Sequence, residues 1–321
     1  MSWKQIRNCQ CANTLVLMMC IILAAIPIAG CSQQTPASPE GKLPVVTTNI
    51  ILADFVKTIG GNLVEVVPII PPGVDPHSFH PSAKTSIDIS NAKLVISNGY
   101  GLETSLKPII DNVIAAEAVY IITTKGLETK PTQAQSANAL GNIMATDEMH
   151  QNEEDPHFWM NPLHTIHYVQ RIRDGLIRAD PVNHIWYNLN TEAYIQKLQD
   201  LDKEIVDILA VVPAEQRHLI TFHDAFSHFA QRYGWRTSTY VTHNATNVTP
   251  KNLAKISLIV QSKGIKAVFS GTHFNTAILE HTAKDLGINI GTIYSDVLEE
   301  DVPTYLDMMR FNAKNLALLL S

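Results

Sequence analysis

The sequence predicts an α/β protein of two lobes, each a parallel sheet flanked by helices, joined by one long linking helix. Short apolar runs alternate with helical patterns along most of the chain, which is typical of parallel sheets covered by helices. One helical pattern continues without a breaker from Asp180-Pro181 to Pro213, longer than either lobe needs, so it indicates a strut between lobes. Polar side chains that follow several predicted strands are expected to face the cleft between the lobes.

Residues 1–30 are predicted to be a lipoprotein signal peptide. Lys4 and Arg7 precede a stretch without charges, and Ile28-Ala29-Gly30 places small residues directly before Cys31, the expected lipidation site. A membrane-spanning helix is the alternative for this stretch, since its length approaches that of a bilayer core. The polar segment that follows Cys31 favours the lipoprotein interpretation.

Residues 31–42 are rich in Ser, Gln, Thr and Pro, and they are predicted to form a flexible tether. The four cysteines all lie at or before Cys31, so neither a disulfide framework nor a thiolate metal ligand is expected in the folded part. Removal of Lys4 and Arg7 with the signal changes the net charge from −6 to −8. This acidic balance argues against nucleic-acid binding.

Residues 43–180 are predicted to form the amino-terminal lobe. Its helices are expected to begin after polar capping residues and to end at glycines, as at Gly60-Gly61. The predicted strands are 44–48, 63–70, 93–97 and 119–123, and the predicted helices are 50–59, 86–92, 102–116 and 162–177. The polar segment 126–154 has no periodicity and ends in an acidic run around His150, which indicates either a solvated loop or a weak cation-collecting flap.

Residues 181–212 are predicted to form the linking helix and residues 213–321 the carboxy-terminal lobe, which repeats the plan of the first. Gly234 and Gly287 are expected to end helices, and Thr249-Pro250 is expected to begin one. The predicted strands are 218–222, 236–241, 267–270 and 288–294, and the predicted helices are 226–233, 250–262, 276–286 and 305–320.

Four side chains are candidate metal ligands, because each follows a short apolar run: His77, His157, His223 and Asp296. The first two lie in Asp-Pro-His motifs, and together the four would give three imidazoles and one carboxylate for a divalent transition metal. The remaining histidines are expected to be surface or packing residues, with His80 the closest rival ligand.

The ordered set of motifs resembles the zinc/manganese solute-binding lipoproteins of bacterial ABC importers. The motifs are Gly73-Val-Asp-Pro-His77-Ser-Phe-His-Pro81, Asn98-Gly99 with Leu102-Glu103, Asp155-Pro-His157-Phe-Trp-Met-Asn-Pro162, His223-Asp-Ala-Phe with Tyr233-Gly234, and Tyr294-Ser-Asp296. The resemblance covers nearly the whole chain after the tether. It implies two α/β lobes with the metal between them, His77 and His157 coming from the first lobe and His223 and Asp296 from the second.

The resemblance leaves the metal open between Zn²⁺ and Mn²⁺. Members with histidine at the third position mostly bind zinc or accept both metals, which favours zinc here, whereas the Tyr-Ser-Asp ending is also common among manganese binders. The family usually has glutamate shortly after the Ala267-Val-Phe269 strand, where this chain has Ser270 and Gly271. The hydrogen bond that this glutamate would make to a ligand histidine is therefore expected to be supplied by another residue, and His273 is a nearby candidate.

The expected function is capture of a divalent metal and its delivery to an ABC permease and its cytoplasmic ATPase, which are other chains. The chain is expected to be a monomer, anchored to the extracytoplasmic face of the cell membrane through lipid on Cys31. A secreted zinc metallohydrolase and a surface adhesin are the alternatives. No His-Glu-x-x-His helix, nucleophile elbow or adhesive repeat supports either of them, so no enzyme is expected.

Overall fold

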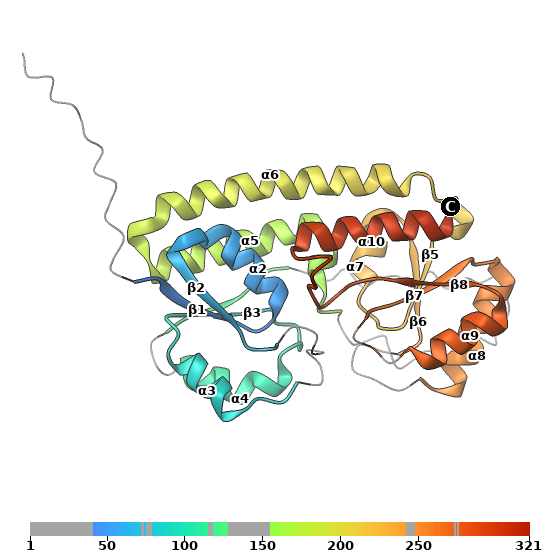
Figure 1. The fold of residues 1–321 in the computed structure, drawn as a ribbon. Coiled ribbons are helices and arrows are strands. Elements are labelled where there is room, and N and C mark those ends of the chain that lie inside the picture. Colours follow the sequence, from blue (N-terminus) through green and yellow to red (C-terminus); the bar gives the residue numbers. More distant parts are fainter. Residues whose placement is uncertain are drawn as a thin grey trace, which may run out of the picture. The chain divides into compact units, whose positions relative to one another are not determined.

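The computed structural model describes residues 41–71, 74, 79–114, 118–127, 155–241, 248–272, 274 and 276–321. Two four-stranded sheets, both wholly parallel, lie in this part of the chain (Figure 1). The first has the order β2-β1-β3-β4, and its strands are Leu43–Thr47 (β1), Val64–Pro68 (β2), Leu94–Ser97 (β3) and Val119–Ile122 (β4). The second has the order β6-β5-β7-β8, and its strands are His218–Thr221 (β5), Arg236–Thr239 (β6), Ala267–Ser270 (β7) and Asn289–Thr292 (β8).

Helices cover both sheets, as the predicted fold class requires. Those of the first half are Ile50–Gly60 (α2), Ala83–Ser90 (α3), Lys107–Ile114 (α4) and Pro162–Ala179 (α5). The long helix is His184–Leu209 (α6), and it lies within the predicted linking segment. Those of the second half are Ser227–Tyr233 (α7), Pro250–Lys263 (α8), Ala277–Leu286 (α9) and Tyr305–Leu320 (α10). The two α/β halves therefore agree with the prediction, while the predicted domain limits stay predictions.

Local chemistry explains where these helices begin and end. Asn49 and Thr249 cap α2 and α8 by accepting hydrogen bonds from Leu52 N and Asn252 N. Gly234 ends α7 with a left-handed φ of 72°, a conformation that costs glycine little. The predicted start of α3 was too late, because Ser82 and Thr85 bond reciprocally in a capping box that the pattern of apolar residues does not reveal.

Helix α6 packs against elements that flank both sheets. Asn190 Nδ2 donates to Ile59 O of α2 at 2.8 Å, Arg232 of α7 pairs with Asp202, and Arg310 of α10 pairs with Glu204. The main hydrophobic core is continuous with this helix, since it includes Leu198 and Ile205 together with residues of both sheets. The structure therefore supports the role of α6 as a strut. Among the described residues, no helix is long and apolar enough to cross a bilayer.

Candidate metal centre

His157 is held in place by the acid two residues before it. Asp155 Oδ1 accepts hydrogen bonds from the His157 backbone N at 2.9 Å and from its ring Nδ1 at 2.7 Å. This contact directs the Nδ1 proton toward Asp155 and leaves Nε2 as the atom that can bind a metal. A 3-10 helix, Phe158–Met160, follows directly. Its Trp159 ring makes an edge-to-face contact with the His157 ring, and the two ring centroids lie 5.1 Å apart.

A buried network of the first half fixes the backbone that precedes His157. Asn98, at the end of β3, donates from Nδ2 to Pro156 O at 2.9 Å, and it accepts at Oδ1 from Tyr168 OH at 2.6 Å. Glu103 in turn accepts from the backbone N of Asn98 and Gly99 at 2.6 and 2.9 Å and from Thr48 Oγ1 at 2.8 Å. The Asn98-Gly99 and Leu102-Glu103 motifs thus act as a structural support for the Asp-Pro-His turn.

His223 and Asp296 come from the carboxyl ends of strands in the second sheet. His223 follows β5, and its carbonyl accepts from Thr221 Oγ1 at 2.7 Å. Asp296 follows β8, and its Oδ2 accepts a hydrogen bond from Ser295 Oγ. Trp159 Nε1 donates to Ser295 O at 2.8 Å, so the segment after His157 is bonded directly to the segment that carries Asp296.

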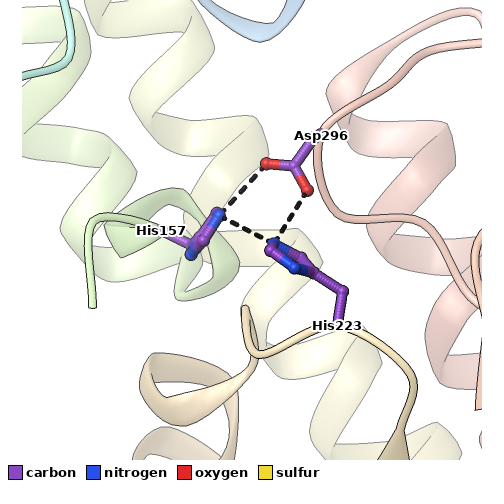
Figure 2. Close-up of side chains that lie close together, drawn as sticks. All are labelled: His157, His223 and Asp296. Carbon is purple, nitrogen blue, oxygen red and sulfur yellow. Dashed lines mark hydrogen bonds and ion pairs between the residues drawn. The ribbon is translucent and has the colours of Figure 1, made fainter. Parts of the chain in front are cut away.

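The three side chains point toward one another (Figure 2), and all three are buried. His157 Nε2 lies 3.2 Å from Asp296 Oδ1 and 3.4 Å from His223 Nε2, and His223 Nε2 lies 3.6 Å from Asp296 Oδ2. His157, His223 and Asp296 are 0, 5 and 3% exposed. Among the described residues this is the one group of three metal-binding side chains whose ligand atoms lie within 4.8 Å of one another.

The electrostatics of this group follow from its buried carboxylates. Burial by itself lowers the pKa of His157, but the charges of Asp296 and Asp155 outweigh it and raise that pKa to about 10. Burial likewise raises the pKa of Asp155, but His157 outweighs it and the net shift is downward. Burial and the Asp155 charge raise the pKa of Asp224 to about 7. The metal-free group therefore holds a proton on His157 at neutral pH, which a metal must displace.

The second half contributes further contacts that the sequence did not reveal. Ser227 N donates to Asp155 Oδ2 at 3.2 Å, and His228 Nε2 lies 2.9 Å from Asp155 O. The His228 ring stacks on Phe158 with centroids 4.1 Å apart. His228 is therefore a packing residue, as expected, but it packs at the candidate site. Its position on a helix gave no signal for this contact, because the partner lies 73 residues away.

The other predicted site residues lie outside the described part of the chain. These are His77, the fourth candidate ligand, and Cys31, the candidate lipidation site. The same holds for His150 and for His273. The carboxylate partner of His157 is Asp155. Ser270, near which the resemblance led us to expect a glutamate, donates from Oγ to the carbonyl of Gly271.

Two α/β halves, each with a parallel sheet, and a buried group of imidazoles and a carboxylate are the features of two-lobed metal-binding proteins, and this chain has both. The family model described as zinc-uptake complex component A, periplasmic, matches residues 45–318, and the chain belongs to this family. This membership makes the chain a substrate-binding protein of a metal ABC transporter, with its folded body outside the cytoplasm.

Named relatives agree with this assignment. The chain is 30% identical to the manganese-binding lipoprotein MntA of Halalkalibacterium halodurans, over 91% of this chain and 94% of the relative. It is also 30% identical to the manganese ABC transporter substrate-binding lipoprotein PsaA of Streptococcus pneumoniae, over 95% and 97%. The solved periplasmic zinc binding protein TroA of Treponema pallidum has a similar fold, with a TM-score of 0.76 at 23% identity over 88% of this chain and 100% of TroA.

Proposed function

We propose that this chain captures one divalent transition metal, zinc first and manganese as the alternative, with His77, His157, His223 and Asp296. The observation that carries the proposal is the convergence of three of these side chains in a buried group. In a tetrahedral zinc shell with bonds of 2.0–2.1 Å, neighbouring ligand atoms lie about 3.3 Å apart. The separations of 3.2 to 3.6 Å between the three side chains fit that requirement.

The donor types favour zinc over manganese. Imidazole is a ligand that zinc prefers, while manganese favours carboxylates, carbonyls and water. A shell of three histidines and one aspartate therefore suits zinc better, although both zinc and manganese appear in the names of similar proteins. Calorimetric competition between Zn²⁺ and Mn²⁺ on the metal-free protein tests this choice, and tighter binding of manganese would overturn it.

Delivery to a membrane partner completes the proposed function. In a shell filled by four protein ligands no position is left for a reactive water, which suits a carrier and not the metallohydrolase considered above. We expect a monomer that presents the loaded metal to the permease of an importer powered by a cytoplasmic ATPase. Lipid on Cys31 would hold the protein at the membrane, and mass spectrometry of a Cys31→Ala variant should then find no lipid. The adhesin alternative has no observation in its favour.

Metal analysis with matched variants tests the ligand assignment. The purified protein should hold about one zinc or manganese ion per chain, and His77→Ala or His223→Ala should abolish tight binding. His184→Ala is the control, because His184 is an exposed histidine on α6. Tight binding that survives the loss of His223, or that is lost with His184, would contradict the assignment.

A further inference from the structure

Four apolar side chains are exposed together where α5 turns into α6. Val182, Ile185, Trp186 and Leu189 are 47, 53, 48 and 51% exposed. The spacing of the last three places them on one face of α6, and Val182 lies in the 3-10 turn Pro181–Asn183 directly before it. We call these four residues the apolar tip. Helix α6 buries Tyr187 and Thr191 on its other face, so the apolar tip belongs to a helix that is packed against the body.

The apolar tip lies near the point where the predicted tether enters the folded body. The residue after Leu189, Asn190, bonds the end of α2 at Ile59 O, and Gly61 lies beside the Asn190 side chain. Three residues after Gly61, Val64 pairs with Leu43, the first residue of β1. These steps put Leu43 and the apolar tip on the order of 20 Å apart. In Figure 1 the start of β1 and the turn between α5 and α6 lie at the same end of the body.

The length of the chain before Leu43 limits how far this end can stand from the membrane. Eleven residues separate Cys31 from Leu43. A segment of this length cannot span more than about 40 Å, even when it is fully extended. If Cys31 carries lipid, as proposed above, the end of the body that holds the apolar tip stays within reach of the bilayer surface.

We propose that the apolar tip inserts into the interfacial layer of the membrane and orients the lipid-anchored body. This inference rests on the proposed lipid anchor at Cys31. A tryptophan flanked by aliphatic side chains on a helix end is the composition that membrane interfaces favour. The two acyl chains of a lipoprotein cysteine already give stable anchoring, so the contact made by the apolar tip would set the orientation of the body rather than its retention at the membrane.

Fluorescence of Trp186 tests the proposal on the lipidated protein in phosphatidylethanolamine/phosphatidylglycerol vesicles that carry brominated acyl chains. Once the signal is removed, the chain keeps three tryptophans, and Trp159 and Trp235 are buried at 0 and 7% exposure. Trp186 should therefore supply the emission that the lipid quenches, and Trp186→Phe should remove the quenching. Quenching should also fall in an Ile185→Ser/Leu189→Ser variant, since each lost apolar contact weakens insertion roughly tenfold.

A matched control uses the other end of α6. Val211 is 62% exposed and lies about 39 Å along the helix direction from the apolar tip. Val211→Trp in the Trp186→Phe background should not be quenched. Vesicle-bound protein whose Trp186 is not quenched would overturn the inference and leave the anchor intact. Protein that does not float with vesicles would overturn both the anchor and the inference, while metal analysis would still test the metal site separately. A blue shift of the Trp186 emission that depends on protein concentration in the absence of lipid would also overturn the inference, because it would identify a contact between two copies of the chain.

Discussion

Asp155, beside the candidate metal centre, is held by a neighbour in the sequence and by a residue of the second half. Asp155 accepts three hydrogen bonds, two from His157 and one from Ser227 N of the second half. A carboxylate that binds the ring Nδ1 of a metal-binding histidine fixes its orientation and makes Nε2 a better donor. The orientation of the His157 ring and the strength of its Nε2 as a metal ligand therefore depend on Asp155.

Asp155→Asn should weaken metal binding by about 10- to 100-fold without changing the stoichiometry. The amide can still accept a hydrogen bond from His157, but it lacks the negative charge that makes the ring a stronger donor. Competition with a metal chelator measures the affinity. Asp54→Asn is a matched control, because Asp54 is also a partly buried acid and accepts from Tyr305 N, outside the group of candidate ligands. Equal affinities for Asp155→Asn and the unchanged protein would contradict this role.

At the scale of elements, the apolar patterns and caps predicted most helices and all eight strands to within a few residues. The predicted helix 102–116 is an exception, since the structure forms a 3-10 turn at Thr104–Leu106 before α4 begins at Lys107. Glu103 explains the irregular start, because its carboxylate bonds the backbone of Asn98 and Gly99. Such a contact depends on the tertiary position of a side chain, so no periodicity reveals it.

The site shows the same limit of sequence reasoning. His223 and Asp296 follow the apolar runs that form β5 and β8, and the structure brings them together with His157. The expectation that His157 also follows an apolar run was wrong, since an acidic segment precedes it, and its Asp-Pro-His motif was the signal that identified it. Ser227 and His228 gave no signal, since their partner Asp155 is more than 70 residues away. Helix contacts are equally hidden: the pattern of α6 predicted its length, but not that the charge of Asp202 meets Arg232 of α7.

Arg232→Ala should lower the free energy of unfolding by about 2–3 kcal/mol. Arg232 makes two hydrogen bonds to Asp202, which is 5% exposed. The substitution removes both and leaves a buried carboxylate that still accepts from the Tyr233 hydroxyl. Urea denaturation measures the change. The exposed pair Lys107–Asp111 provides the comparison, and Lys107→Ala should cost less than about 1 kcal/mol. Equal losses for the two variants would show that the Asp202 contact is not a structural link.

At the scale of the whole molecule, the candidate metal centre joins segments that belong to both halves. His157 precedes α5, while His223 and Asp296 follow strands of the second sheet, and α6 packs along both halves. A bound metal would therefore link the same parts that α6 already holds, so its binding energy would add to the stability of the complete body. Conditions that destabilise one half should consequently also weaken metal retention.

Acid is such a condition, and His218 in β5 should account for part of its effect. Burial, with Lys263 and Arg236 nearby, lowers the pKa of His218 to about 4, from 6.5 in an unfolded chain. The unfolded state therefore binds a proton first as pH falls, so stability present above pH 6.5 is lost between 6.5 and 4, by at most about 3 kcal/mol. His218→Gln can keep the hydrogen bond to Ser238 and should flatten the stability curve in that window, measured by urea denaturation of metal-free protein. An equally steep curve for His218→Gln would refute the assignment.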